Sequence, residues 1–566
     1  MTISDGLNYY MHWVPAVLLD ITGNRNMATT QESSKTIPMR EYDAVIVGAG
    51  FAGLFMLHRL RGLGLSTRVY EAGSGVGGTW YWNRYPGARC DVESMEYSYQ
   101  FSNELEQQWD WTERYAGQPE ILKYINHVAD RFNLNEDIEL NARVSSVVYD
   151  EPSRRWIVTS ERGSVSAQYC IMATGCLSSP DKPDFKGLDS FAGSTFHTGN
   201  WPHDGVDFSG KRVGIIGTGS SAIQSIPIIA AEADHLTVFQ RTPNYSVPAR
   251  NRPLAPTVQQ EVKANYKELR EENSQMPFGW GANLGLREDS ALDATPEERR
   301  REFEKRWQAG GLPFIGAFGD LLYSQDANDT AAEFVREKIH EIVRDPAVAE
   351  TLSPDNVVGC KRLCADSGYY ETFNRPNVTL VDVNETPIEE ITATGLRTTT
   401  ENYPVDSIVF ATGFDAMTGA LFAIDIRGRE NISLEEKWSA GPRTFLGLGT
   451  AGFPNVFTIT GPGSPSVLSN MLPSIEQHVN WIADCVTYIA EHGHESIEVT
   501  IEAEDAWVDH VNEVANATLF PSCNSWYLGS NVPGKPRVFM PYLGFPSYVK
   551  KCNEIVASGY EGFELK

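Results

Sequence analysis

Two segments of the chain share the same order of apolar run, glycine turn and helix-like run. The first apolar run, 43–47, leads through a glycine turn into a helical pattern, and the second, 212–216, does the same. Short continuous apolar runs bounded by glycine are typical of strands buried in a parallel sheet. The pattern therefore predicts two α/β units, each with a doubly wound parallel sheet.

Each unit also closes with the same pattern, an apolar run that leads into Ala-Thr-Gly. The two copies lie at 173–175 and 411–413. A glycine in such a turn lets the backbone approach a ligand at the carboxyl end of a strand. An ordinary strand end explains one such turn, but two copies downstream of two glycine turns favour a ligand site in each unit.

Between 251 and 354 the apolar pattern changes to charged runs with helical periodicity. Within it, Thr295-Pro296-Glu297-Glu298 has the N-cap, first-turn proline and acidic residues of a helix start. The organisation that these changes predict is as follows: a flexible arm at 1–40, one dinucleotide domain at 41–176 and 406–566, a second at 177–250 and 355–405, and a helical insertion in the second domain at 251–354.

The composition of the first forty residues predicts a flexible arm outside the folded domains. Their apolar stretch, 13–19, is broken by Pro15 and is far shorter than the ~20 apolar residues of a membrane helix. It has no basic segment before it, so we expect neither a secretory signal nor a membrane anchor, and a cytoplasmic protein. Translation from Met27 would remove part of this arm.

Composition narrows the class of protein. The chain has 566 residues with 41% hydrophobic and 21% charged, which predicts several cores in a soluble globular protein. A formal net charge of −27 argues against a nucleic-acid partner, because phosphate affinity comes mainly from clustered Lys and Arg. The eight cysteines show neither zinc spacing nor a Cys-x-x-Cys pair, so we expect reduced structural thiols, no metal site and no disulfide reductase.

The first glycine turn has the G-x-G-x-x-G spacing of a dinucleotide loop, with Gly48, Gly50 and Gly53 at the fixed positions. These glycines permit a tight turn and close approach of the backbone to a pyrophosphate at the helix N-terminus. Glu71 ends the next apolar run, where an acid can bind ribose hydroxyls. This half therefore predicts a Rossmann-type site for FAD.

The second glycine turn differs at its end and in the strand that follows. Ala222 replaces the third glycine, and the next apolar run ends in Arg241-Thr242 rather than in an acid. An acid would repel a 2′-phosphate, whereas an arginine can pair with it, so this half predicts NADPH. The alternative is that Arg241 is an ordinary surface arginine.

The segment between the two units resembles a known family. Phe191, Gly193, His197, Trp201 and Pro202 match every fixed position of the F-x-G-x-x-x-H-x-x-x-W-P signature of Baeyer–Villiger monooxygenases, which are class B flavoproteins. The chain most resembles the cyclohexanone and phenylacetone monooxygenase group. The resemblance runs from Tyr42 to the C-terminus and includes the following segments: 77–91, 361–362, 413–415, 461–465, Trp526 and 531–536.

The resemblance implies a reaction. In this family NADPH reduces FAD, O₂ adds to give a flavin C4a-peroxide, and the peroxyanion attacks a ketone to give an ester or lactone. The expected partners are a small ketone and O₂, in a monomer or weak oligomer. Two other interpretations stay open: a flavin-containing monooxygenase that oxygenates N or S atoms, and a non-enzymatic NADPH-binding redox sensor.

The resemblance also implies roles for single residues. Arg362 is expected to stabilise the peroxyanion, because a fixed cation away from water stabilises developing charge most. Asp91 is expected to position Arg362, and Lys361 to join Arg241 at the 2′-phosphate. Trp526 is expected to close over the nicotinamide and substrate. His197 is expected to link the domains, the alternative being a general base.

Two sets of residues complete the expected site. The ketone pocket is expected at Ser464, Ser466, Val467, Leu468 and Met471, whose small or apolar side chains suit an uncharged substrate, although each one could belong to an ordinary core loop. The expected cofactor-binding residues are Gly48, Gly50, Phe51, Gly53, Glu71, Gly78, Thr79, Trp80, Trp82, Arg89, Cys90, Asp91, Tyr97, Val144, Thr218, Gly219, Ser220, Ser221, Ala222, Gln224, Arg241, Thr242, Lys361, Arg362, Met471 and Trp526.

Overall fold

The computed structural model describes residues 39–566 except 182 and 536–539. The chain divides into two units, Met1–Met39 and Arg40–Lys566, and the second carries all the helices and strands given below. The predicted arm at 1–40, with its apolar stretch and Met27, falls outside the described residues except for its last two positions. Strand β1 begins at Arg40.

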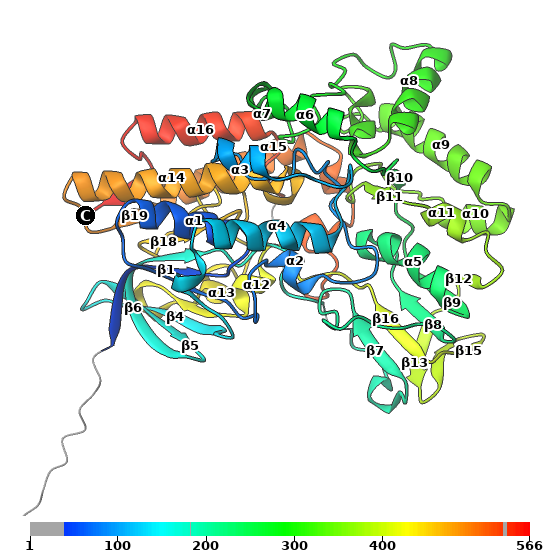
Figure 1. The fold of residues 1–566 in the computed structure, drawn as a ribbon, viewed down its shortest axis with the longest axis horizontal. Coiled ribbons are helices and arrows are strands. Elements are labelled where there is room, and N and C mark those ends of the chain that lie inside the picture. The colour runs from blue at the N-terminus through cyan, green and yellow to red at the C-terminus, as the bar shows by residue number, and fades with distance from the viewer. Residues whose placement is uncertain (1–38, 182, 536–539) are drawn as a thin grey trace, which may run out of the picture. The chain divides into compact units, whose positions relative to one another are not determined.

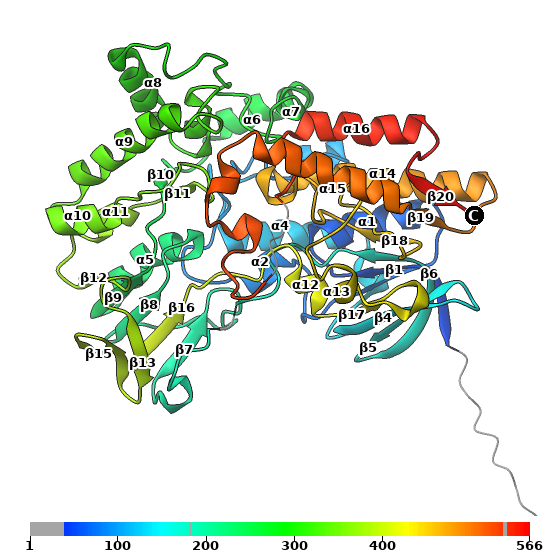
Figure 2. The ribbon, with the colours of Figure 1, turned by 180° about the vertical axis from the view of Figure 1, so that it is seen from behind.

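The first sheet has eight strands in the order β17-β4-β5-β6-β1-β2-β3, with β18 beside β6 (Figures 1 and 2). Its central strand β1 is parallel to both neighbours, β2 and β6, and helix α1 follows it directly. Helix α14 packs on α1. The bounds are β1 (Arg40–Val47), β2 (Thr67–Tyr70), β3 (Ile138–Glu139), β4 (Val144–Asp150), β5 (Arg155–Ser160), β6 (Gly163–Met172), β17 (Asp425–Arg427), β18 (Val456–Thr458), α1 (Phe51–Gly62) and α14 (Met471–Glu491).

The second sheet has five strands in the order β12-β9-β8-β16-β7, and all of its pairs are parallel. Helix α5 follows the second glycine turn, as α1 follows the first. The bounds are β7 (Ser194–His197), β8 (Arg212–Ile216), β9 (His235–Gln240), β12 (Val378–Asp382), β16 (Ser407–Phe410) and α5 (Ser220–Glu232).

Strand β16 lies on the other side of a predicted domain boundary. The sequence prediction assigned 406–566 to the first domain, but β16 pairs with β8 and β7 in the second sheet. The boundary at 406 is therefore wrong for this strand. The physical reason is that the second Ala-Thr-Gly turn must follow a strand beside the second glycine turn. The other predicted boundaries stay predictions.

Helices dominate the stretch between β10 and β11. They are α6 (Pro256–Ala264), α7 (Tyr266–Ser274), α8 (Pro296–Ala309), η3 (Leu312–Ala317), α9 (Gln325–Ile342) and α10 (Pro346–Leu352). Helix α8 starts as its sequence predicts, because the Glu298 amide donates to Thr295 Oγ1 at 3.3 Å and the Thr295 amide donates to Glu298 Oε2 at 2.9 Å. These two bonds satisfy amides that the first turn leaves without helical partners.

The remaining elements connect and cover the two sheets. The helices are α2 (Thr79–Trp82), α3 (Asn103–Gln108), α4 (Gln118–Arg131), α11 (Tyr369–Thr372), α12 (Gly419–Phe422), α13 (Leu434–Lys437), α15 (Ile501–Asn516) and α16 (Phe545–Ala557), with short 3₁₀ turns η1 (Asn135–Asp137), η2 (Leu188–Ser190), η4 (Arg429–Asn431), η5 (Ser466–Leu468), η6 (Phe520–Ser522) and η7 (Trp526–Leu528). The strands are β10 (Ser246–Pro248), β11 (Cys364–Asp366), β13 (Ile388–Thr392), β14 (Gly395–Thr398), β15 (Asn402–Pro404), β19 (Ile497–Val499) and β20 (Phe563–Leu565).

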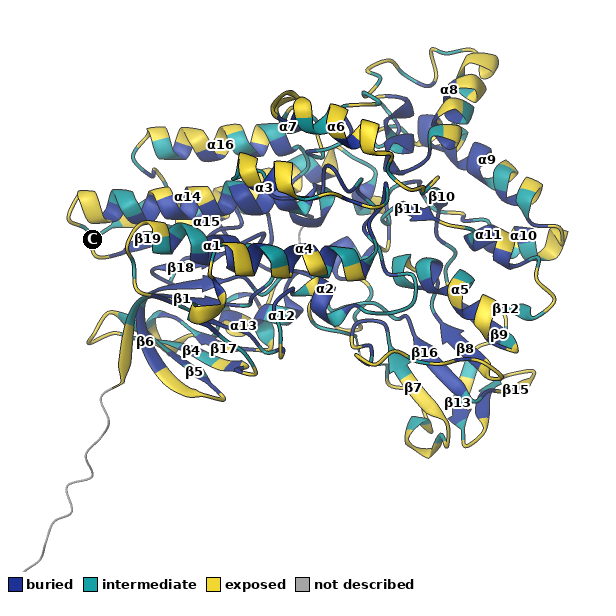
Figure 3. Ribbon diagram, in the orientation of Figure 1, coloured by how far each residue is buried: buried dark blue, intermediate teal, exposed yellow. Residues whose placement is uncertain are grey.

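Separate apolar cores form around the two sheets. Strands β8 and β16 are buried over most of their length and β1 over its second half, as Figure 3 shows in dark blue. Side chains on both faces of such strands meet covering elements, which is why their sequences are continuous apolar runs. Along the described part of the chain, every helix is either too short or too polar to cross a bilayer.

Both glycine turns pack against the Ala-Thr-Gly turn of their own unit. Gly48 has φ +106° and Gly217 has φ +110°, a region that favours glycine. A Cβ atom on Gly48 would lie 2.5 Å from the Ala173 carbonyl oxygen, and one on Gly217 would overlap the Ala411 oxygen. In each unit, the glycine turn and the Ala-Thr-Gly turn therefore form one close contact with each other.

We predict that Gly217→Ala destabilises the protein. The new methyl group meets the Ala411 oxygen and forces a residue with a Cβ into positive φ, a strain of about 1–3 kcal/mol. The expected result is a Tm several degrees lower in thermal unfolding without added nucleotide. Gly219→Ala is the matched control, because its Cβ meets no atom within 4 Å and its φ is −80°. Equal Tm values for the two variants would contradict the packing argument.

Candidate active site

A cavity of about 1930 Å³ lies where the two glycine turns and the two Ala-Thr-Gly turns face a common space. Its wall also includes residues of 77–92, residues 173–181 and 183–185, which we call the crossing segment, and the turn at Trp526. A single small-molecule site typically measures about 300–1,000 Å³, so this cavity has room for more than one large ligand.

Most of the predicted residues line this cavity. They are Gly48, Gly50, Phe51, Glu71, Gly78, Thr79, Trp80, Trp82, Arg89, Cys90, Asp91, Tyr97, Val144, Thr218, Gly219, Ser220, Ser221, Gln224, Arg241, Thr242, Lys361, Arg362, Val467, Met471 and Trp526, together with His197 and Pro202 of the signature. The structure brings them together from both sheets. Their individual roles stay predictions.

Several predicted residues lie outside the cavity wall. Gly53 is a packing position, because a Cβ there would overlap the Gly48 carbonyl oxygen, and Ala222 is fully buried in the second core. In the predicted ketone pocket, Ser464 and Ser466 turn their hydroxyls into the protein, where they donate to the carbonyl oxygens of Gly461 at 2.7 Å and Thr460 at 3.1 Å.

The predicted ketone pocket stays a prediction, and its residues differ in where they lie. Leu468 packs into an apolar cluster and is absent from the wall, so only Val467 and Met471 of the five predicted pocket residues reach the cavity. Small polar residues suggested a pocket in the sequence, but in the structure their hydroxyls satisfy buried carbonyls of their own turn.

Glu71 lies beside the first glycine turn. Its carboxylate accepts hydrogen bonds from the amides of Ala49 at 2.8 Å and Gly73 at 2.7 Å, and the residue is buried. The acid is therefore fixed at the end of β2, in the position from which ribose hydroxyls can be bound.

Aromatic side chains close the same half of the cavity. Trp80 Nε1 donates to the Tyr97 hydroxyl at 3.1 Å, and the Phe51 and Tyr97 rings meet edge to face at 5.7 Å. Gly78, at φ +53°, lies so close to Gly50 that a Cβ would approach its Cα to 2.9 Å. The glycine turn at Gly50 and the aromatic side chains therefore pack closely, and a planar ligand can lie against them.

Two cations mark the second half of the cavity. Arg241 follows β9 and is exposed, while Lys361 is half-buried. Burial lowers the pKa of Lys361, and the nearby Arg241 charge lowers it further. Neither side chain forms an ion pair with a residue that the structure describes. Two neighbouring positive charges at a cavity wall favour an anionic ligand group.

The second glycine turn is fixed by its own hydroxyls. Thr218 Oγ1 donates to the Thr242 carbonyl oxygen at 2.8 Å, so the turn and the Arg241-Thr242 pair move as one piece. Ser220 Oγ lies 3.1 Å from Cys364 Sγ, and Ser221 Oγ lies 3.2 Å from Thr198 Oγ1. The turn is thereby tied to β11 and to the end of β7.

Arg362 and Asp91 lie at the junction of the two halves. Arg362 Nε is 3.8 Å from Asp91 Oδ2, and Arg362 Nη1 donates to the Val467 carbonyl oxygen at 2.8 Å. The side chains are 28% and 9% exposed, respectively. Gln224 Nε2 donates to Asp91 Oδ1 at 3.3 Å. The guanidinium is therefore held from two sides, with part of its surface open to the cavity.

Charge coupling keeps this arginine protonated. Burial alone would lower the pKa of Arg362, but the neighbouring Tyr527 hydroxyl and Asp91 carboxylate outweigh it and raise that pKa. Burial raises the pKa of Asp91, and the Arg362 charge opposes that rise. The pair thus places a permanent positive charge at the cavity wall with a carboxylate behind it.

His197 joins the crossing segment to the second sheet. Its Nδ1 accepts from the Gly199 amide at 2.9 Å, so Nε2 carries the proton, and Nε2 lies 3.1 Å from the Asp181 carbonyl oxygen and 3.2 Å from Thr412 Oγ1. Burial lowers its pKa, which favours the neutral ring. Both nitrogens are engaged, so this arrangement supports a linking role rather than a general base.

The other signature residues pack rather than bind. A Cβ on Gly193 would overlap the Asp406 carbonyl oxygen, and Trp201 is buried against Phe196 and Phe208. Phe191 packs on an apolar cluster of the second sheet. The signature therefore describes how the segment 191–202 is seated on β16 and its neighbours.

Two cavity residues, Tyr85 and Asn244, and the buried Tyr527 had no distinguishing signal in the sequence. Tyr85 donates to Gln224 Oε1 at 2.9 Å, and Asn244 Nδ2 donates to the Arg362 carbonyl oxygen at 3.3 Å, so both support residues around Arg362. Burial raises the pKa of Tyr527, which faces Arg362, to about 12. Single tyrosines and asparagines carry no spacing that would have singled them out.

Arg89 and Cys90 are two further predicted cofactor-binding residues. The Arg89 guanidinium donates to Glu113 at 3.1 Å and to the Tyr115 carbonyl oxygen at 3.0 Å. These two bonds hold the side chain. The Arg89 backbone instead exchanges hydrogen bonds with the Gln224 amide, at 3.3 and 3.1 Å. Burial raises the pKa of Cys90 to about 12, so this thiol is neutral.

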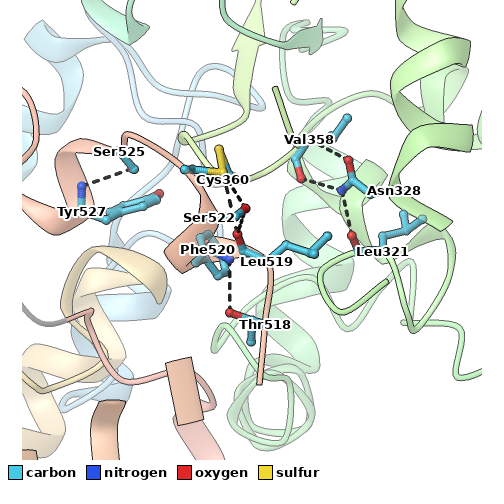
Figure 4. The surroundings of a disulfide bond; sticks show 11 residues. Leu321, Asn328, Val358, Cys360, Thr518, Leu519, Phe520, Ser522, Ser525 and Tyr527 are labelled. Carbon is cyan, nitrogen blue, oxygen red and sulfur yellow. Dashed lines mark hydrogen bonds between the residues drawn. A yellow bond between two sulfur atoms is a disulfide. The ribbon is translucent and has the colours of Figure 1, made fainter. Parts of the chain in front are cut away.

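One sequence expectation about the cysteines is wrong. Cys360 and Cys523 form a disulfide with their Cα atoms 6.2 Å apart, whereas all eight cysteines were expected to be reduced (Figure 4). The partners are 163 residues apart in sequence, a separation that no local spacing rule detects. The other six cysteines are buried and unpaired.

Known proteins match this chain over nearly its whole length. A Baeyer–Villiger monooxygenase of Pseudooceanicola batsensis is 44% identical over 537 residues, which cover 94% of this chain and 97% of the relative. The chain belongs to the Baeyer–Villiger monooxygenase family. A phenazine N-monooxygenase of Lysobacter antibioticus is 42% identical and covers 93% of this chain and 97% of its own length. A family model described as pyridine nucleotide-disulphide oxidoreductase matches residues 45–279 of this monooxygenase.

Solved structures agree with the fold and identify the cofactors. An oxidised steroid monooxygenase bound to NADP is 54% identical, with a TM-score of 0.88 and coverage of 93% and 99% of the two chains. A complex of OTEMO with FAD and NADP is 39% identical, with a TM-score of 0.89 and the same coverage. This monooxygenase has two Rossmann-type domains and uses FAD and NADPH.

Proposed function

We propose that this monooxygenase inserts an oxygen atom beside the carbonyl of small ketones, giving esters or lactones, at the cavity wall around Arg362. The observation that carries the proposal is the cation of Arg362, held by Asp91 and the Val467 carbonyl oxygen between the two nucleotide turns. Negative charge that develops on oxygen during the attack is stabilised by such a preorganised cation.

The residues present fit both cofactors. For FAD, the close-packed turn at Gly48, the fixed carboxylate of Glu71 and the aromatic wall at Trp80 provide sites for pyrophosphate, ribose and a planar ring. For NADPH, the turn at Gly217 and the Arg241 and Lys361 cations provide the phosphate sites. When bound, FAD supplies oxygen-transfer chemistry and NADPH supplies the hydride.

The ketone is proposed to bind next to Val467, Met471 and Trp526. These three side chains share the cavity wall with Arg362. Their apolar surfaces suit an uncharged substrate and exclude water from the reacting atoms. Arg362 would orient the carbonyl oxygen, and Asp91 would keep the guanidinium aligned through its buried carboxylate.

We predict that Arg241→Ala and Lys361→Ala each raise KM for NADPH about tenfold or more, the effect of losing one charge-assisted hydrogen bond to a phosphate. KM for NADH should change little, because NADH lacks the 2′-phosphate. Steady-state kinetics with both nucleotides measures this. Lys211→Ala is the control, since this exposed lysine precedes β8 at the far end of the strand and is absent from the cavity wall. Equal loss with NADH would contradict the phosphate assignment.

We predict that Arg362→Ala lowers ester formation about 10²–10³-fold, the typical cost of removing one preorganised charge at the reacting atoms. NADPH should still reduce the flavin, because the nucleotide turns are intact. Stopped-flow reduction and product analysis by gas chromatography separate these steps. Asp91→Asn should reduce ester formation less than Arg362→Ala, because the cation remains. Full ester production by Arg362→Ala would remove the assignment.

The related phenazine N-monooxygenase gives a second candidate activity, oxygenation of a heteroatom. A purified holoenzyme assay with a ketone panel and with phenazine, followed by product identification, decides between them. Esters or lactones from ketones support the proposal, and N-oxides without esters favour the second candidate. Binding of NADPH without oxygen uptake would instead indicate a redox sensor.

The proposal also includes a cytoplasmic, monomeric or weakly associating enzyme. Six buried cysteines are unpaired, as is usual in a reducing compartment, and the Cys360–Cys523 disulfide is the exception to that pattern. A net charge of −27 supports mutual repulsion between copies and no nucleic-acid partner.

A further inference from the structure

The Cys360–Cys523 disulfide joins two segments of the active-site wall. Cys360 lies directly before the Lys361-Arg362 pair, and Cys523 lies shortly before the turn at Trp526. Lys361, Arg362 and Trp526 all line the cavity. The bond therefore sits behind the wall at the point where the Arg362 segment meets the Trp526 turn.

The backbone of the Trp526 turn has few attachments to other segments. From Phe520 to Lys535, backbone hydrogen bonds among the described residues stay within a few positions of the same segment. Ser525 Oγ accepts from the Tyr527 amide at 3.3 Å (Figure 4). The Trp526 and Tyr527 rings lie 4.2 Å apart. The backbone of the turn is thus held locally, and its position depends on the packing of Tyr527 and Leu528 in an apolar cluster with Val357 and on what anchors its ends.

The anchors at its two ends lie on different parts of the protein. Before the turn, the Leu519 amide donates to the Leu322 carbonyl oxygen at 2.9 Å. After it, Asn531 Nδ2 donates to the Phe414 carbonyl oxygen at 2.7 Å, and Lys535 Nζ pairs with Asp415 and donates to the Ala416 carbonyl oxygen at 2.8 Å. Between these points, the disulfide is the covalent link that fixes the turn against the Arg362 segment.

The Arg362 side of the bond is already rigid. Asn328 Nδ2 donates to the Val358 carbonyl oxygen at 3.0 Å, and the Val358 amide donates to Asn328 Oδ1 at 2.9 Å (Figure 4). Asn244 holds the Arg362 carbonyl oxygen. Breaking the disulfide should therefore release the Trp526 turn rather than Arg362.

We propose that Cys360 and Cys523 form a redox-modifiable site that controls the coupling of NADPH oxidation to ester formation by fixing the Trp526–Tyr527 turn over the Arg362 cation. The disulfide state holds the turn in place, and the dithiol state lets it move and admit water. The proposal rests on the proposed function for its ester readout.

The chemistry requires only hydrogen peroxide and a dithiol. The Cys360 thiolate attacks peroxide, breaks its O–O bond and forms a sulfenic acid, releasing hydroxide. The Cys523 thiolate then attacks the Cys360 sulfur and displaces a second hydroxide, so two thiols and one peroxide give one disulfide and two waters. A dithiol reverses this by two exchange steps and is itself oxidised to a disulfide.

The burial of Cys360 and Cys523 limits the size of the reagents that can reach the disulfide. Cys360 is 1% exposed and Cys523 is 6% exposed. Thiol exchange depends on access as well as on nucleophilicity. Hydrogen peroxide and a small dithiol are therefore the probes, and bulky thiols should react slowly.

The first experiment counts thiols in the holoenzyme. After peroxide treatment, alkylation under denaturing conditions should label six cysteines, and after dithiothreitol it should label eight. Mass spectrometry should place the difference at Cys360 and Cys523. Eight labelled thiols after peroxide, or a different pair, would overturn the proposal.

The second experiment compares coupling in the two states after the reagents are removed. Reduction should raise the NADPH consumed per ester at least twofold and raise KM for NADPH, and peroxide should restore both. Cys523→Ala should have the coupling and the KM of the reduced enzyme, and dithiothreitol should change neither. Cys552→Ala, which removes a buried unpaired thiol in α16, is the matched control and should keep the response.

The outcomes separate this site from the proposed function. Identical coupling and identical KM in the two states overturn the redox site, even if both states make ester. If neither state makes ester although the flavin is reduced, the proposed function fails. In that case, a rise in KM for NADPH on reduction still supports the redox site, and an unchanged KM overturns it. Should Cys523→Ala fold poorly, the reagent-treated unsubstituted enzyme still gives the answer.

Discussion

The structure depends on one close contact, made twice: a glycine Cα pressed against the carbonyl oxygen of an Ala-Thr-Gly turn. At Gly48 and Ala173, and again at Gly217 and Ala411, there is no space for a Cβ atom. This contact joins the carboxyl ends of β1 and β6 in the first sheet and of β8 and β16 in the second, and those ends face a single cavity. Two nucleotide sites next to a shared space follow from that constraint, and so does a reaction that passes electrons from one to the other.

A permanent cation at the meeting point needs support from several segments. Arg362 is held by Asp91, by the Val467 carbonyl oxygen and, through its own backbone, by Asn244. Its charge costs little to bury because the cavity leaves 28% of the side chain open and a carboxylate lies behind it. His197 lies beside this arrangement: its Nδ1 accepts from the Gly199 amide, and its Nε2 lies near the Asp181 carbonyl oxygen and Thr412 Oγ1, so it ties the crossing segment to the second sheet.

Much of the fold and of the cofactor wall could be predicted from the sequence, because each depends on local constraints. Glycine at positive φ, apolar runs in buried strands, and an acid or an arginine after the second strand all leave a mark at fixed spacing. What could not be predicted depends on contacts between distant segments. Strand β16 belongs to the second sheet because of its neighbours, Ser466 points inward because of a carbonyl in its own turn, and Cys360 pairs with a partner 163 residues away.

The disulfide shows why the distant contacts matter for chemistry. The nucleotide turns are built into sheets and cannot shift without breaking strand pairs, so they fix the cofactor positions. The Trp526 turn has no such frame, and its backbone hydrogen bonds among the described residues are local. A site that must admit a ketone and then exclude water needs one wall that is less rigid than the rest. A single covalent link from that wall to the segment of Arg362 sets its freedom, and a link made of two thiols makes that freedom depend on redox conditions.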